Sequence, residues 1–188
     1  MKKARLPRTN LGRLVAKVRS IIFLWGVSFS LFLSSSILAK ANSLSIQDPD
    51  YQDGIPKQTR VYFELVGNEY GIAPELLEAI AYRESRFIPT VKNGNHYGLM
   101  QVNVKTHSER IAKYGWTAND MLDPYKNLMV AADYLLELFE EYEDVPLVLC
   151  IYSGNWKAVA RYKEFGFMPG YCEDVLERSA EYERLHGK

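Results

Sequence analysis

The sequence predicts an all-α protein in which one compact domain of six to eight helices follows an N-terminal signal segment. From Lys57 onward, apolar residues recur at intervals of three and four rather than two, which is the period of amphipathic helices. No stretch of more than a few residues alternates between apolar and polar as a half-buried strand does. The 188-residue chain, with its N-terminal segment set aside, has the length of a single domain.

The first 41 residues have the composition of an export signal. Residues 1–20 carry seven lysines and arginines and no acidic residue, and residues 21–38 are apolar or small throughout. Ala39-Lys40-Ala41 is a small-x-small pattern suited to a signal peptidase, so we expect cleavage after Ala41. The apolar run is also long enough for an uncleaved anchor in the inner membrane. In either case we expect the rest of the chain outside the cytoplasm, in the periplasm or cell envelope.

Residues 42–56 are interpreted as a linker or N-terminal arm, and residues 57–188 as the working domain. Residues 42–188 hold 15 lysines and arginines against 23 acidic residues, a net charge of −8. Because nucleic acid needs cations to neutralise its phosphates, an acidic domain without a basic stripe argues against a nucleic-acid partner.

The first two helices are delimited by glycine and proline. One is expected over residues 58–70, ending at Gly71, and the next begins at Pro74, a residue well suited to a first helical position. Pro89 limits how far the second helix can run. The inward stripe of this second helix is predicted to contain Leu76, Leu77, Ile80 and Ala81.

The later helices follow a polar loop over residues 92–96. Thr106 and Glu109 form the pattern of a capping box, which predicts a short helix closed by Gly115, and Thr117 with Asp120 indicates another start. The remaining helices are expected to be a long one from Asp123-Pro124 to about Tyr142, then residues 146–152, residues 156–165 capped by Asn155, and residues 171–185.

Cys150 and Cys172 are the two cysteines of the chain. In an oxidising compartment they could form a disulfide, or they could be two small apolar residues buried in separate helices. His96, His107 and His186 match no metal-ligand spacing, so no metal site is predicted.

Glu84 falls on the buried stripe of the second helix, four residues after Ile80. Burial of an ionised carboxylate is costly, so such a group tends to raise its pKa and to hold a proton. A raised pKa suits a general acid that then acts as a base. The alternative is a surface glutamate that pairs with Arg83 or Arg86.

Three short motifs occur in order along the chain: Glu84-Ser85, Gly-Leu-Met-Gln at residues 98–101, and Tyr-Ser-Gly-Asn at residues 152–155. Together they resemble the motifs of the soluble-type (SLT domain) lytic transglycosylases, a branch of the lysozyme-like superfamily. The resemblance covers about residues 58–178 and implies a lysozyme-like helical fold. It also implies an enzyme that cleaves the glycan strands of peptidoglycan without a cofactor.

The resemblance assigns a role to each motif. Glu84 would be the single catalytic acid and base, and Ser85 would orient that glutamate or the sugar. Residues Gly98, Met100 and Gln101 would line the glycan cleft, with Met100 against a sugar face, and the hydroxyl of Tyr152 would reach Glu84. Ser153 stands where the family usually has asparagine, so the third motif departs from the pattern.

The implied reaction breaks the bond between N-acetylmuramic acid and N-acetylglucosamine and leaves a 1,6-anhydromuramyl end. A lysozyme-like hydrolase, with water in place of the sugar C6 hydroxyl, is one alternative. A weakly active glycan-binding accessory domain of an envelope-spanning assembly is another. Small members of this family are often attached to secretion or conjugation machinery, which is therefore an expected partner beside peptidoglycan.

Overall fold

The computed structural model describes residues 51–52 and 55–188. The predicted signal segment, residues 1–41, and most of the predicted arm, residues 42–56, lie outside the described residues. Within the described part, no helix is both long enough and apolar enough to cross a membrane.

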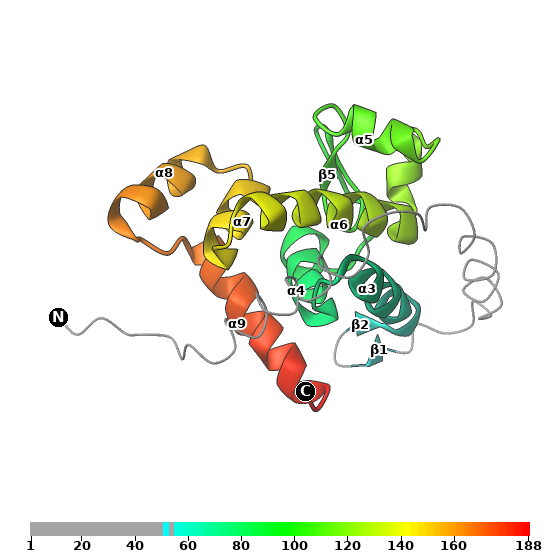
Figure 1. Ribbon diagram of the computed structural model, residues 1–188. Helices are drawn as coiled ribbons and strands as arrows, with labels where there is room; N and C mark the ends of the chain where they lie inside the picture. Colours follow the sequence, from blue (N-terminus) through cyan, green and yellow to red (C-terminus); the bar gives the residue numbers. More distant parts are fainter. Residues whose placement is uncertain (1–50, 53–54) are drawn as a thin grey trace.

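The predicted all-α class is confirmed (Figure 1). The helices are α3 (Lys57–Tyr70), α4 (Pro74–Ser85), α5 (Ser108–Lys113), the 3-10 helix η1 (Ala118–Leu122), α6 (Pro124–Glu141), α7 (Val145–Tyr152), α8 (Trp156–Phe165) and α9 (Gly170–Leu185). Among the described residues, short strands accompany them: β1 (Tyr51–Gln52), β2 (Ile55–Pro56), β3 (Lys92–Asn93), β4 (His96–Tyr97) and β5 (Val102–Asn103).

Helix α4 is the buried centre of the domain. Figure 1 shows it between α3 and α9, and its contacts with both helices are extensive. All four residues predicted for its inward stripe are fully buried: Leu76, Leu77, Ile80 and Ala81. Burial of each large aliphatic side chain contributes about 2 kcal/mol. The helix that carries Glu84 is therefore held in place from several sides.

The polar loop predicted over residues 92–96 is instead part of a small antiparallel sheet. Strand β3 pairs with β4, and β4 pairs with β5, with Lys92 opposite Tyr97 and His96 opposite Asn103. The two residues between β3 and β4 are Gly94, with a φ of 60°, and Asn95. Glycine at the first position of a two-residue turn is a hairpin signal. Strands of two residues are too short to show the alternation by which a sheet is recognised.

The predicted capping box of Thr106 and Glu109 is wrong, and the helix start predicted at Thr117 and Asp120 is confirmed. Helix α5 begins at Ser108 without a side-chain cap, because the N–H of Thr106 instead donates to Oδ1 of Asn103 (3.2 Å). The capping box of Thr117 and Asp120 is present at η1. The side chain of Asp144 also caps α7, which therefore begins at Val145, one residue earlier than predicted.

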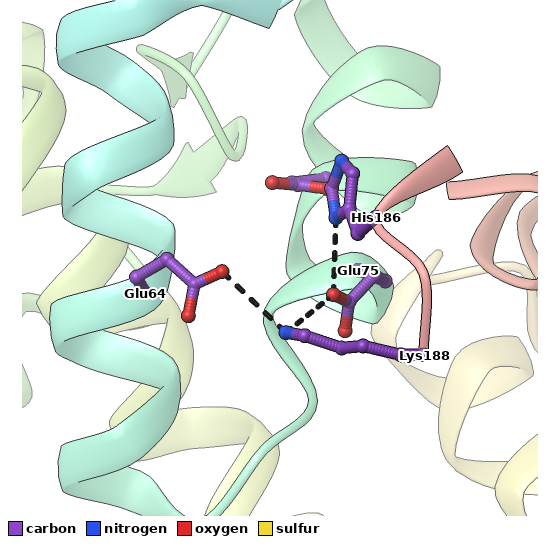
Figure 2. Close-up of polar contacts among 5 residues, drawn as sticks. Glu64, Glu75, His186 and Lys188 are labelled. Carbon is purple, nitrogen blue, oxygen red and sulfur yellow. Dashed lines mark hydrogen bonds and ion pairs between the residues drawn. The ribbon is translucent and has the colours of Figure 1, made fainter. Parts of the chain in front are cut away.

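The C-terminal residues fold back onto α3 and α4 (Figure 2). Lys188 Nζ lies 2.7 Å from Oε1 of Glu75 and 3.5 Å from Oε1 of Glu64. His186 Nδ1 lies 3.1 Å from the same oxygen of Glu75. These contacts fix the end of α9 against the start of the helix that carries Glu84.

Candidate active site

Glu84 lies in the last turn of α4, where the chain reverses sharply. Arg86 and Phe87 both take the left-handed conformation, with φ of 54° and 62°, although neither is glycine. The N–H of Arg86 donates to the carbonyl of Tyr82 (3.0 Å) and ends the helix. Residues in this sparsely populated region cost free energy and are concentrated at functional sites. The strained turn directs the chain away from Glu84 into the small sheet.

Burial raises the pKa of the half-buried Glu84 above its ordinary value, as predicted from its place on the stripe. A hydrogen bond from Tyr171 and the charges of Arg83 and His96 partly oppose this effect. The alternative of a surface ion pair is wrong, because Arg83 Nε lies 3.4 Å from Oδ2 of Asp174 and the guanidinium of Arg86 lies over the ring of Tyr82.

The tyrosine that binds Glu84 is Tyr171, at the start of α9. Its hydroxyl donates to Oε1 of Glu84 over 2.6 Å. The resemblance had assigned this contact to Tyr152, whose hydroxyl instead donates to the carbonyl of Met100 (2.9 Å). Tyr152 and Glu84 line the same cavity, and burial, together with the negative charge of Glu84, raises the pKa of Tyr152.

Ser85 and Met100 are buried next to the site and do not line the cavity. Ser85 is buried, and its hydroxyl donates to the carbonyl of Leu99 (2.6 Å), which fastens residues 98–101 to α4. The Met100 side chain is fully buried. The expectation that it packs against a sugar face is therefore wrong, because the side chain is not among those that line the cavity.

Gly98 is required by the protein backbone rather than by a ligand. Its φ is 80°, and a Cβ there would lie 2.0 Å from the carbonyl oxygen of Met121 and 2.5 Å from Nδ2 of Asn127. Asn127 was not among the predicted site residues, although it is fully buried. Its side chain accepts from the N–H of Met100 (2.7 Å) and donates to the carbonyls of Tyr97 (2.7 Å) and Met121 (2.9 Å).

Gln101 and Ser153 do reach the cleft. The amide of Gln101 donates to the carbonyl of Gly98 (2.9 Å) and so holds its own loop closed. The hydroxyl of Ser153 donates to the carbonyl of Cys150 (2.7 Å). Asn155 does not replace the family asparagine in the cleft, because its exposed side chain caps α8 by accepting from the N–H of Ala158.

The residues around Glu84 line a cavity of about 230 Å³. Its lining comes from α4, the small sheet and the segment after it, α6 and α7. The lining residues are Glu84, Asn93, His96, Gln101, Val102, Asn103, His107, Val130, Ala131, Tyr134, Tyr152, Ser153 and Gly154. Within the described part of the chain, no group of three or more histidine, cysteine or acidic side chains could hold a metal ion.

Several of these residues were not predicted from the sequence. His96 and Asn103 face each other across β4 and β5, with 3.5 Å between His96 Nε2 and Asn103 Nδ2. The ring of His107 lies 4.4 Å from that of Tyr134 on α6. The Gly94-Asn95 turn could have indicated the hairpin. No sequence pattern indicates that His107 contacts Tyr134, because the two residues lie in different elements of the chain.

Chemically, the site offers one protonatable carboxyl group beside donors and acceptors of hydrogen bonds. Tyr171 donates to Oε1 of Glu84, and Glu84 lines the cavity. Amide and imidazole groups on the small sheet face the cavity beside it. This arrangement suits protonation of a leaving-group oxygen on a neutral polar substrate.

The chain matches the family model described as "Transglycosylase SLT domain" over residues 62–165. The match contains Glu84 and all three sequence motifs, and it ends before Tyr171.

Several curated proteins are similar to parts of the chain. Protein IpgF of Shigella flexneri is 31% identical over 128 residues, which are 62% of this chain and 77% of that protein. The X polypeptide of Escherichia coli is 32% identical over 106 residues, 53% of this chain and 56% of that protein. An endo-type membrane-bound lytic murein transglycosylase A of Cronobacter sakazakii is 33% identical over 78 residues, 38% of each chain.

Proposed function

Because the chain belongs to the transglycosylase SLT domain family, its activity is that of a peptidoglycan lytic transglycosylase, and we propose that Glu84 is its catalytic acid and base. The proposed substrate bond joins N-acetylmuramic acid to N-acetylglucosamine. The proposed product is a 1,6-anhydromuramyl end.

The observation that carries this proposal is that Glu84 is the one carboxylic acid among the described residues that line the cavity. Most glycosidases that add water use two carboxylates on opposite sides of the scissile bond, separated by roughly 5 to 9.5 Å. A single carboxyl group supports a reaction in which the substrate supplies its own nucleophile. For this reason we favour the transglycosylase over the lysozyme-like hydrolase.

The proposed reaction has two proton transfers through one residue. Neutral Glu84 first protonates the glycosidic oxygen as the bond to C1 breaks, and the neighbouring N-acetyl carbonyl stabilises the cationic centre. The resulting carboxylate then removes the proton from the C6 hydroxyl, whose oxygen closes onto C1. The raised pKa of Glu84 supports the first step, because it keeps the acid form populated nearer to neutral pH.

The other residues have supporting roles in this proposal. Tyr171 orients the carboxyl group, and Gln101 and Ser153 bind the N-acetyl or hydroxyl groups of the sugars. Ser85 and Asn127 position the backbone of residues 98–101 beside the carboxyl group. The serine at position 153 reaches less far into the cleft than the usual asparagine of the family.

We also propose that the protein acts in the periplasm or cell envelope, where its substrate lies. The name of the Cronobacter relative, which describes a membrane-bound murein transglycosylase, supports this location. Attachment to an envelope-spanning secretion or conjugation assembly is a further part of the proposal. A crosslinked pull-down from envelopes that recovers no component of such an assembly would contradict that part.

The test is digestion of peptidoglycan sacculi, with the released fragments analysed by mass. Anhydro ends are lighter than reducing ends by one water, so one spectrum separates the two reactions. We expect anhydro fragments from the unaltered protein and a loss of roughly a hundredfold or more in Glu84→Gln. Glu78→Gln is the matched control, because it is the same substitution on the same helix at a fully buried position outside the cavity.

Other outcomes would redirect the assignment. Reducing ends in place of anhydro ends would show a lysozyme-like hydrolase. Release of no fragments by the unaltered protein, with sacculi still bound in a sedimentation assay, would favour the glycan-binding accessory domain. Undiminished digestion by Glu84→Gln would show that the catalytic acid is another residue.

A further inference from the structure

Cys150 and Cys172 meet in the core between α7 and α9. Their sulfur atoms lie 3.0 Å apart, and both residues are fully buried. A disulfide bond is about 2.05 Å long, so bond formation needs a movement of about 1 Å. We propose that these two cysteines form an intramolecular disulfide that fixes Tyr171 against Glu84.

The position of the pair connects it to the site. Cys172 directly follows Tyr171, whose hydroxyl donates to Oε1 of Glu84. Cys150 lies on α7, two residues before Tyr152, which lines the cavity. A covalent bond at this point joins the first turn of α9 to the helix that forms one wall of the cleft.

The first turn of α9 contacts α4 as well as α7, since Arg83 lies over the ring of Tyr171 and its Nε lies 3.4 Å from Oδ2 of Asp174. The segment between α7 and α9 is α8 and its loops, and Val159 is the one buried residue of α8. Pro169 precedes α9 and provides no side-chain cap. Figure 1 shows α8 projecting away from the body of the domain. On the side away from α4, the position of Tyr171 depends on the contact between α7 and α9, in which the two sulfur atoms take part.

The bond forms by thiol–disulfide exchange. A thiolate of one cysteine attacks a disulfide-bearing oxidant, and the second cysteine then displaces that oxidant from the mixed disulfide. The Cys150–Cys172 bond forms, two electrons and two protons pass to the oxidant, and the oxidant leaves as a dithiol. This step rests on the proposed envelope location, since such oxidants maintain disulfides there.

Burial determines when the bond can form. Burial raises the pKa of both the Cys150 and the Cys172 thiols, and the folded domain leaves neither exposed. The attacking thiolate is therefore scarce once α9 has packed. The bond is expected to form during folding and then to be shielded from reductants, which makes it a permanent connection rather than a reversible switch.

The first test measures thiols and is independent of activity. The full chain is recovered from an oxidising compartment, unfolded without reductant, alkylated and digested. We expect no alkylation, a linked peptide pair that contains both cysteines, and a mass lower by two hydrogen atoms than that of the reduced chain. Full alkylation of both thiols would overturn the proposal, whatever the enzyme does to peptidoglycan.

The second test measures the coupling to Glu84. The oxidised chain is compared with chain refolded under reductant and with the Cys150→Ala/Cys172→Ala variant. The carboxyl carbon of Glu84 is titrated by NMR with labelled glutamate, and its signal is identified by its absence in Glu84→Gln. The Tyr171 hydrogen bond lowers the pKa of Glu84. We therefore expect a higher Glu84 pKa in the reduced chain and in the double alanine variant, which lack the disulfide, than in the oxidised chain.

Turnover should fall when the disulfide is absent, with kcat roughly threefold to tenfold lower in the reduced chain than in the oxidised chain. In Tyr171→Phe, the oxidised and reduced forms should have the same Glu84 pKa, because the Tyr171 hydroxyl, through which the disulfide affects Glu84, is absent. Identical titration curves for the oxidised and reduced unaltered chain would overturn the coupling. That result stays separate from a failure of the catalytic proposal, because the titration needs no substrate.

Discussion

The hydroxyl of Tyr171 donates a 2.6 Å hydrogen bond to Oε1 of Glu84, across 87 positions of the sequence. Two opposing effects meet at this carboxyl group. Burial favours its neutral form, and the hydrogen bond favours its ionised form. The balance keeps the pKa above its ordinary value while one oxygen stays fixed in direction. Both properties serve a residue that must first give up and then accept a proton.

Tyr171→Phe is expected to raise the pKa of Glu84, because the donor that stabilises the carboxylate is lost. The alkaline limb of the pH–rate profile should move to higher pH, since the lost hydrogen bond favours the ionised form of Glu84. The measurement is the initial rate of fragment release from sacculi between about pH 4 and pH 9.

Tyr152→Phe is the matched control for that experiment. Its hydroxyl binds the carbonyl of Met100 rather than the carboxyl group, so its loss should loosen residues 98–101 without moving the profile. A shift in Tyr152→Phe as large as that in Tyr171→Phe would contradict the assignment of Tyr171 as the residue that positions Glu84.

Glu78 provides a prediction about stability. It is fully buried on α4, and neither of its carboxyl oxygens has a hydrogen-bond partner among the residues that the structure describes. Burial raises its pKa to about 8. The titratable and charged groups that face it are Arg60 and Glu64 of α3, Glu75 of α4, and His186 and Lys188 beyond α9. His186 Nδ1 lies 3.8 Å from Oε2 of Glu78, and Figure 2 shows how His186 and Lys188 reach this region.

A raised pKa means that the folded state holds a proton on Glu78 that the unfolded chain releases above about pH 4.5. The contribution of Glu78 to the free energy of unfolding is therefore complete below that pH and falls as the pH rises toward 8. The slope is at most about 1.4 kcal/mol per pH unit. Glu78→Gln removes the titrating group, so it should stabilise the protein near pH 9 relative to the unaltered chain and have little effect near pH 5.

Urea unfolding of both proteins at the two pH values measures this difference. Glu64→Gln is the control, because this carboxylate is partly exposed and pairs with Lys188. The prediction fails if the difference between Glu78→Gln and the unaltered chain is the same at both pH values. Contributions from groups that do not interact with Glu78 cancel in the comparison.

Asn127→Ala is expected to destabilise the domain by about 3 kcal/mol, because it leaves three buried backbone groups without their partner. The measurement is the midpoint of urea unfolding. Asn155→Ala is the control, since it removes one exposed helix cap and should cost about 1 kcal/mol. Equal losses in the two variants would mean that the Asn127 side chain does not organise residues 98–101.

Gly98→Ala should prevent stable folding, because the added Cβ would overlap the carbonyl oxygen of Met121. We expect a loss of more than about 3 kcal/mol, visible as a loss of soluble protein. Gly94→Ala separates this overlap from backbone strain alone. Gly94 also has a positive φ but has open space around it, so about 1–2 kcal/mol is expected there. A soluble, active Gly98→Ala variant would contradict the required close approach.

The helical fold and the position of Glu84 could be predicted from local patterns. The period of the apolar residues predicted the buried stripe of α4, and proline, glycine and short polar side chains predicted most helix boundaries. The same stripe identified Glu84 as a candidate catalytic residue, because a carboxyl group occupies a position where an apolar residue was expected. These features depend on residues within a few positions of each other, which is the range over which a helix organises its own chain.

The roles of the supporting residues depended on contacts between distant segments. The sequence contained Tyr152, Tyr171, Met100 and Asn127, but only packing decided that Tyr171 binds Glu84 and that Met100 lies beneath the site. The small sheet was also missed, because its strands of two residues are defined by their pairing.

The sequence by itself therefore determined the helices, the buried carboxyl group and the family motifs. The tertiary structure decided which side chains face the cavity and which support it. The physical reason is that hydrogen bonds such as those of Tyr171 and Asn127 form between helices, strands and loops far apart in the chain. Their partners are set by how the apolar faces pack together, and no short segment contains that information.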